Sequence, residues 1–165
     1  MPEASRSVVV NTTPLITLSV ATGSLDVLRV LYDRVIIPHE VMREIQAGGQ
    51  DAPGTGDVLS SDWMETLRHP QSVALFLRNT LDIGEAAVIQ AAMQLQIPRV
   101  CIDEKLGRRV ARLNGLTVTG SIGVLAKAKR AGFALDVEQT MNRLRAHGIW
   151  LGRDVEQFLR DTDSQ

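Results

Sequence analysis

Short runs of β-branched and aliphatic residues alternate along the chain with longer segments whose apolar residues recur at helical spacing. The strand-like runs cover residues 8–10, 35–37, 100–102 and 116–118. Their composition is typical of short buried strands. The first run is followed by Asn11, by Thr12 or Thr13 as a possible helix cap, and by Pro14, which suits a first helical turn. The alternation predicts a three-layer α/β/α fold with a central, mostly parallel sheet flanked by helices.

Helical spacing and weaker patterns fill the rest of the chain. Helices are expected from Pro14 and over 25–31, 38–47, 86–95, 104–113, 122–130, 137–147 and 154–159. We also expect a short strand over 63–67, a helical turn over 72–77 and a last strand over 149–151. Residues 48–62 are rich in Gly, Asp, Ser and Pro, which predicts a loop. The pieces on either side of this loop are too small to fold alone, so we expect one domain over 1–165.

Composition narrows the possible functions. The formal net charge of −1 gives no general positive field, so a polyanion would have to meet a local basic patch. The single cysteine, Cys101, fits a reducing cytosol, and we expect a cytoplasmic protein. No secretory signal and no membrane-spanning apolar run are present in the sequence, so no membrane partner is expected. Neither a Gly-x-Gly-x-x-Gly nor a P-loop motif occurs, which argues against a Rossmann-like nucleotide-binding protein.

Four polar residues stand where predicted strands end or helices begin: Asn11, Glu44, Glu85 and Asp103. Ligands of open α/β sheets bind at the carboxyl ends of the strands, so these side chains are candidates for one site near Asn11. Three of them are carboxylates, and hard oxygen ligands suit Mg²⁺ or Mn²⁺ rather than Zn²⁺. Gathered acids repel one another unless a cation neutralises them. Such a cation can generate a hydroxide and stabilise the charge that builds on a phosphodiester.

Each of these residues also has a purely structural interpretation. The sequence Asp82-Ile-Gly-Glu85 has the form of a capping box, in which Glu85 only stabilises a helix. Asp103 can be a helix cap, Glu44 a solvated carboxylate beside Arg43, and Asn11 a turn residue that bonds its own backbone. Composition alone leaves both interpretations open.

Five segments occur in the order found in one known family. They are Val-Val-Asn11-Thr-Thr-Pro-Leu-Ile, Val-Ile-Ile-Pro-His-Glu-Val-Met-Arg-Glu44, Leu-Asp-Ile-Gly-Glu85-Ala, Cys-Ile-Asp103-Glu-Lys-Leu-Gly-Arg-Arg-Val-Ala and Val-Thr119-Gly-Ser-Ile-Gly-Val-Leu. Together they resemble a PIN domain, and in particular the PIN-like group DUF3368, which is related to VapC-type toxins. The resemblance covers nearly the whole chain and implies a metal-dependent ribonuclease fold with a compact acidic site.

The resemblance also implies roles for individual residues. Glu44, Glu85 and Asp103 would be catalytic and hold Mg²⁺ or Mn²⁺, and Glu104 is an alternative to its neighbour Asp103 as the metal ligand. Thr12 and Thr119 match polar positions that line the family's site. Asn11 stands where many PIN domains have their first aspartate. An amide oxygen can ligate magnesium, but it brings no negative charge and cannot act as a base.

A basic helix follows the third predicted strand. Lys105, Arg108, Arg109 and Arg112 recur at helical spacing and share one face. Beside the acidic site they would hold RNA phosphates. The alternative is an ordinary solvated face.

Two functional hypotheses follow. The first is a Mg²⁺- or Mn²⁺-dependent endoribonuclease, the toxin of a VapBC-like toxin–antitoxin pair, with RNA as substrate and a cognate antitoxin as partner. The second is a degenerate PIN-like module that binds RNA or protein without cutting, and Asn11 favours it. Apolar residues of the N-terminal half, expected to be exposed, suggest a homodimer.

Overall fold

A computed structural model describes residues 6–162 of the chain. Within this range the strands are β1 (Ser7–Val10), β2 (Arg34–Ile37), β3 (Glu65–Thr66), β4 (Arg99–Cys101) and β5 (Thr117–Thr119). All of their pairings are parallel, in the order β3-β2-β1-β4-β5. Val9 pairs with Ile36 on one side and with Val100 on the other, which places β1 at the centre of the sheet. The predicted α/β/α class with a parallel sheet is confirmed.

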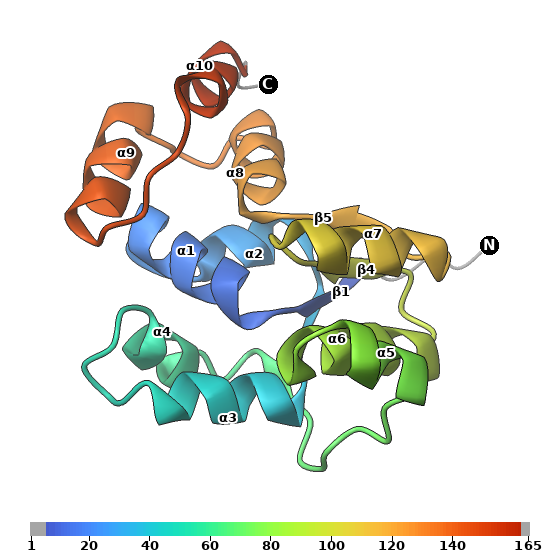
Figure 1. The fold of residues 1–165 in the computed structure, drawn as a ribbon. Helices are drawn as coiled ribbons and strands as arrows, with labels where there is room; N and C mark the ends of the chain where they lie inside the picture. The colour runs from blue at the N-terminus through green and yellow to red at the C-terminus, as the bar shows by residue number, and fades with distance from the viewer. Residues whose placement is uncertain (1–5, 163–165) are drawn as a thin grey trace.

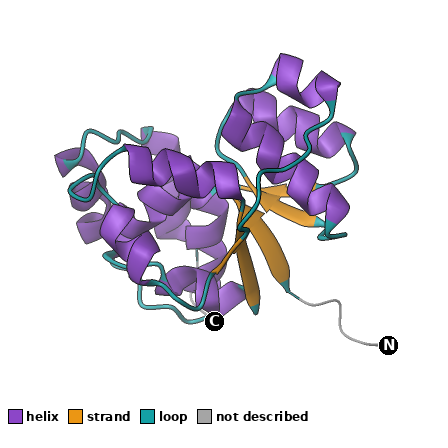
Figure 2. Ribbon diagram, turned by 90° about the horizontal axis from the view of Figure 1, so that it is seen from below, coloured by secondary structure: helices purple, strands orange, loops and turns teal. Residues whose placement is uncertain are grey.

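Helices cover both faces of this sheet (Figures 1 and 2). On one side lie α1 (Thr12–Thr22), α2 (Asp26–Leu31), α3 (His39–Ala47), α4 (Thr55–Ser60), α8 (Ser121–Arg130), α9 (Val137–Ala146) and α10 (Arg153–Asp161). On the other lie α5 (Leu75–Thr80), α6 (Ile83–Gln94) and α7 (Lys105–Leu113). Helices α3 and α6, which come from opposite sides, nevertheless contact each other.

The direction of the strand order reverses between β1 and β4. The chain places β2 and β3 next to one edge of β1, and it then returns to place β4 and β5 next to the other edge. The connections on the two sides leave a crevice at the carboxyl ends of β1 and β4, where ligands of such folds bind. Asn11 directly follows β1, and its backbone N–H donates to the Cys101 carbonyl of β4 at 3.0 Å. The sheet therefore brings the residues after β1 and β4 together.

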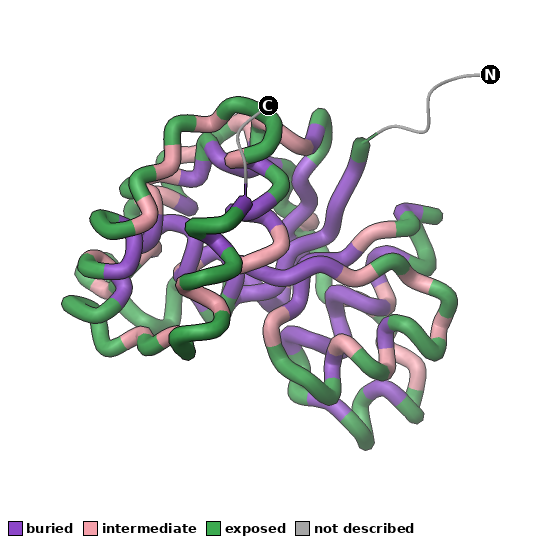
Figure 3. The backbone as a smooth tube through the Cα atoms, turned by 90° about the horizontal axis from the view of Figure 1, so that it is seen from above, coloured by how far each residue is buried: buried purple, intermediate pink, exposed green. Residues whose placement is uncertain are grey.

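The core lies on both sides of the central strand. All four residues of β1 are buried, and the aliphatic side chains of β2, β4 and the helices complete a continuous apolar cluster. Figure 3 shows that buried backbone follows the strands and the inward turns of the helices, whereas loops and outer turns are exposed. A site at the strand ends is therefore built on the most rigid part of the molecule.

Two local predictions are corrected by the structure. Residues 48–62 are not all loop, because α4 forms within them; it buries only Thr55 and Val58, too few residues for a periodic signal. Residues 149–151 form no strand. The Ile149 N–H donates instead to the Leu144 carbonyl of α9 at 2.9 Å. The apolar run 149–151 is therefore a loop in which Ile149 and Leu151 pack on the core and Trp150 is exposed.

The apolar residues of the first two helices are mostly buried, whereas Leu59, Leu75 and Phe76, further along the N-terminal half, are exposed as expected. The leucines of α1 and α2 up to position 28 are buried in the core, and so are most of the valines there. They therefore give no support to a homodimer. No helix within residues 6–162 is long and apolar enough to cross a membrane.

Candidate active site

A pocket of about 290 Å³ opens at the crevice between β1 and β4. Its lining comes from the ends of β1 and β4, from α3, and from the start of α6. The lining residues are Asn11, Thr12, Thr13, Glu44, Thr80, Leu81, Asp82, Glu85, Glu104 and Leu106. Segments far apart in the sequence thus contribute one amide and four carboxylates to the same pocket.

Asn11 and Glu44 face each other across the start of α6. Asn11 is only 5% exposed, and its Oδ1 has no hydrogen-bond partner among the described residues. Glu44 Oε2 accepts a hydrogen bond from Thr12 Oγ1 at 2.8 Å. A Cβ built on Gly84 would lie 3.0 Å from Glu44 Oε2 and 3.3 Å from Asn11 Oδ1. The glycine therefore leaves room for two oxygen atoms that point at the same place.

Thr12 does not cap α1, as one interpretation of the sequence allowed. Helix α1 begins at Thr12 itself, with Asn11 in the N-cap position and no side-chain cap bond. The Thr12 hydroxyl is instead used to orient Glu44. This contact agrees with its predicted place at the edge of the site.

Glu85 is the most perturbed acid of the pocket. Its side chain is almost fully buried, and Oε1 accepts no hydrogen bond from any described residue. Burial, and then the negative charges of Asp82 and Glu104, raise the pKa of Glu85 from 4.5 to about 7. A buried carboxylate oxygen without a donor is costly unless a cation or ligand satisfies it.

The cap of the predicted capping box is formed by Asp82. Asp82 accepts the Glu85 backbone N–H at 2.8 Å, so Asp82 is indeed the cap of α6. Sequence reasoning assigned Asp82 this structural role alone, but its carboxylate also lines the pocket. The proximity of Asp82 to Glu85 in a first helical turn was the signal for this second role.

The structure separates Asp103 from its neighbour Glu104. The Asp103 carboxylate accepts both the backbone N–H and the hydroxyl of Ser121, at 2.7 and 2.5 Å. It thereby holds the first residue of α8, a helix whose own N-cap, Gly120, provides no side chain. Asp103 does not line the pocket, whereas Glu104 does. Of the two acids after β4, Glu104 is the one that faces Glu85.

Other predicted site residues lie around the pocket rather than in it. Thr119 is buried and lines a separate cavity of about 200 Å³ on the side of Tyr32 and Lys127. Arg108 is half-buried, and its Nη1 donates to the Ile102 carbonyl at 2.9 Å. The remaining basic residues of α7, Lys105, Arg109 and Arg112, are exposed. None of these side chains lines the acidic pocket itself.

The donor set of the pocket fits a hard divalent cation. No three His, Cys, Asp or Glu side chains between residues 6 and 162 are arranged so that they could hold a metal by themselves. The pocket instead combines the Asn11 amide oxygen with Glu44, Glu85 and Glu104. Two of its oxygen atoms, Asn11 Oδ1 and Glu85 Oε1, are buried without a partner in the described chain. Oxygen ligands of this kind are those that Mg²⁺ and Mn²⁺ prefer.

Comparison with known proteins identifies the family of the chain. The family DUF3368, described as a PIN domain, matches residues 7–164. No curated protein and no solved structure matched the chain. PIN domains are generally nucleases and typically use divalent metal ions. Because the match spans nearly the whole sequence, the chain belongs to the PIN-domain family.

Proposed function

We propose that the chain is a Mg²⁺- or Mn²⁺-dependent endoribonuclease whose active site is the acidic pocket. The observation that carries the proposal is the pair of buried, unpartnered oxygens, Asn11 Oδ1 and Glu85 Oε1, in a pocket that Glu44 and Glu104 also line. Such a pocket costs folding free energy unless it binds a cation. The PIN family supports a nuclease-type function for it.

The residues of the pocket divide the work. Asn11, Glu44, Glu85 and Glu104 would hold the cation, directly or through water, and Thr12 would fix the orientation of Glu44 through its hydroxyl. A bound divalent cation supplies a metal-activated water and stabilises charge on the phosphodiester. Asp103 acts from behind the pocket, because its bonds to Ser121 fix the end of β4 against α8. We assign Asp103 a positioning role, and Glu104 the metal-facing role that the sequence left open between the two.

The exposed basic residues of α7 would contact the RNA backbone. Helix α7 begins directly after Glu104, so it starts at the edge of the acidic pocket. Lys105, Arg109 and Arg112 are exposed on this helix, and phosphate contacts of this kind position a nucleic acid without reading its sequence. Arg108 contributes through its bond to the Ile102 carbonyl, which stabilises the end of β4.

Cleavage of a labelled RNA with Mn²⁺, with Mg²⁺ and with EDTA tests the proposal. The native chain should cut only with metal, and Glu85→Gln and Glu104→Gln should lose most of this activity. Glu138→Gln is the matched control, since Glu138 is exposed and pairs with Arg160 outside the pocket. Equal cleavage by the native chain and Glu85→Gln, or cleavage in EDTA, would refute the assignment.

The second candidate is a PIN domain that binds RNA or protein without cutting. Asn11 is the specific observation that favours it, because the neutral amide removes one charge from the cation site. Asn11→Asp discriminates between the two. If the native chain is inactive and Asn11→Asp gains metal-dependent cleavage, the native protein is a degenerate binding module.

The biological role that we propose is the toxin of a VapBC-like pair, acting as a homodimer and neutralised by a cognate antitoxin. The support is membership of the PIN family, whose nucleases often pair with antitoxins. Exposed apolar side chains on α5, α6 and α7, including Leu75, Ile83 and Leu113, provide surface for a partner. Growth arrest on expression, relieved by Glu85→Gln, tests the toxin role, and light scattering tests the dimer.

A further inference from the structure

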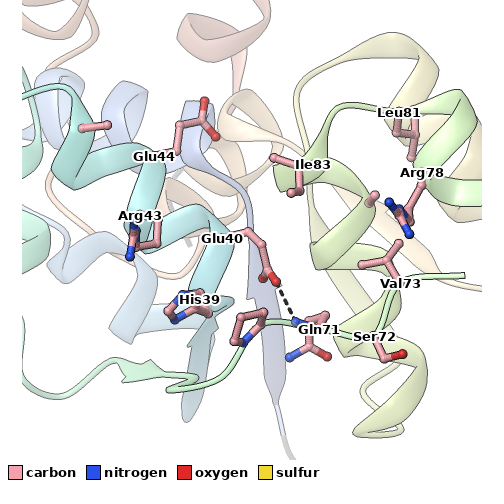
Figure 4. A pocket seen from close by; sticks show the side chains of 13 residues that line it. His39, Glu40, Arg43, Glu44, Gln71, Ser72, Val73, Arg78, Leu81 and Ile83 are labelled. Carbon is pink, nitrogen blue, oxygen red and sulfur yellow. Dashed lines mark hydrogen bonds between the residues drawn. The ribbon is translucent and has the colours of Figure 1, made fainter.

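A second and larger cavity, of about 830 Å³, adjoins the acidic pocket. It lies between α3, the segment 70–73 and the start of α6 (Figure 4). Glu44 and Leu81 line both cavities, so the two cavities are adjacent. A molecule seated in the larger cavity would therefore lie next to the proposed cation site.

A buried carboxylate stands in the wall of this cavity. Glu40 is 8% exposed, and its Oε1 accepts the Gln71 backbone N–H at 2.6 Å. Its Oε2 has no hydrogen-bond partner in the described chain. Figure 4 shows the carboxylate directed at Gln71 with the cavity beside it. Glu40 plays no part in the acidic pocket, so its free acceptor oxygen requires another explanation.

The remaining lining has two further properties. Val73, Leu81, Ile83 and Ala86 provide an apolar wall. His39, Arg43 and Arg78 add basic groups, and the structure shows no ion pair for either arginine within residues 6–162. A cationic side chain entering from a partner would meet these arginines and be repelled. An anionic ligand would be attracted to them.

We infer that this cavity binds a guanine base of the RNA, next to the phosphodiester at the cation site. The inference rests on the proposed function. A nucleotide combines the three required features: a flat apolar ring, a phosphate for Arg43 or Arg78, and donors for Glu40 Oε2. Guanine is favoured among the bases because its N1–H and 2-amino group form adjacent donors that a carboxylate can accept.

Binding of nucleoside 5′-monophosphates in EDTA tests the inference apart from catalysis. Isothermal titration of the full chain with GMP, AMP, CMP and UMP should give the tightest binding for GMP, by about tenfold, as expected for a hydrogen bond to a charged acceptor. IMP keeps the N1–H and lacks the 2-amino group, so its affinity should lie between those of GMP and AMP.

Glu40→Gln changes the recognition with little change in shape. Its amide oxygen can still accept the Gln71 N–H, but an NH₂ donor then replaces the free acceptor. The preference for GMP over AMP should disappear, while Glu138→Gln should keep it. If Glu40→Gln does not fold, Ser72→Trp places a bulky ring at the exposed rim of the cavity and should abolish GMP binding.

The outcomes separate the two proposals. Absence of nucleotide binding, equal binding of the four nucleotides, or an unchanged GMP preference in Glu40→Gln would overturn the guanine site, even in a chain that cuts RNA with Mn²⁺. Glu40-dependent binding of an arginine-rich peptide in place of nucleotides would overturn it in favour of a protein partner. Selective GMP binding by a chain that does not cut RNA would support the cavity and refute the nuclease.

Discussion

Replacing Glu85 by glutamine should make the metal-free protein more stable and the metal-bound protein less so. Glu85 is a buried acid whose pKa is raised from 4.5 to about 7, chiefly by burial and then by the charges of Asp82 and Glu104. The folded chain therefore binds the Glu85 proton more tightly than the unfolded chain does. The free energy of unfolding therefore falls as the pH rises from about 4.5 through 7, because ionising Glu85 costs more in the folded state than in the unfolded state.

The size of the effect follows from the pKa. A rise from 4.5 to about 7 corresponds at full strength to about 3 kcal/mol of lost stability above pH 7. Glu85 faces an open pocket, and solvent screening reduces this value to about 1–2 kcal/mol. In EDTA at pH 8, Glu85→Gln should thus raise the free energy of unfolding by that amount. For a chain of this length the melting temperature should rise by roughly 3–6 °C.

Thermal unfolding of both chains at pH 5 and pH 8, with EDTA or Mn²⁺, measures each part of this reasoning. At pH 5 the two chains should have nearly the same stability, because Glu85 is then mostly protonated. Added Mn²⁺ should stabilise the native chain at pH 8 and have little effect on Glu85→Gln. Glu138→Gln, an exposed Glu, should behave as the native chain. A Glu85→Gln protein that is less stable than native in EDTA at pH 8 would refute the argument.

Three further substitutions test the pocket geometry. Gly84→Ala should gain about 0.5–1 kcal/mol of helix stability but weaken Mn²⁺ binding, because its Cβ meets two pocket oxygens at 3.0 and 3.3 Å; Gly56→Ala, with open space around it, should change only stability. Asp103→Ala removes both hydrogen bonds to Ser121, so it should lower the free energy of unfolding by about 1–3 kcal/mol. Its Mn²⁺ affinity should stay near the native value, and a complete loss of metal binding would contradict the positioning role of Asp103. Asn11→Asp should lower stability in EDTA at pH 8 and raise Mn²⁺ affinity, as measured by unfolding and titration; unchanged affinity would place Asn11 outside the cation site.

The strands could be predicted where burial on both faces left a continuous β-branched run. Val8–Val10 and Val35–Ile37 have this composition because parallel strands are covered by helices on both sides. The same reasoning failed at 149–151, because an apolar loop that is held against α9 has the same composition as a short strand. A short apolar run indicates that its side chains are buried, but it does not indicate whether a neighbouring strand is available for backbone hydrogen bonds.

The site could be predicted to the level of the strand ends and no further. Placement after β1 and β4 indicated Asn11 and the pair Asp103 and Glu104, and of these three residues Asn11 and Glu104 line the pocket. Which member of the pair faces the pocket depends on the direction of one side chain, and this is set by Ser121, eighteen residues away. Glu40 carried no signal at all, since one acid on the amphipathic α3 is the ordinary pattern of a surface helix.

The amide at position 11 changes the balance of charge in the pocket. Asn11 Oδ1 and Glu44 Oε2 both lie within 3.3 Å of the point where a Gly84 Cβ would stand. Position 11 is buried, so a carboxylate there would place a buried negative charge beside the charge of the exposed Glu44. The pKa of Glu85 is raised first by burial and then by the negative charges of Asp82 and Glu104, so a further buried charge in this pocket would be costly. Asparagine keeps an oxygen ligand at the end of β1 without that repulsion. We therefore expect the chain to fold at lower cost without a cation. The proposed nuclease activity should then need a higher concentration of free metal than a pocket with aspartate at position 11 would need.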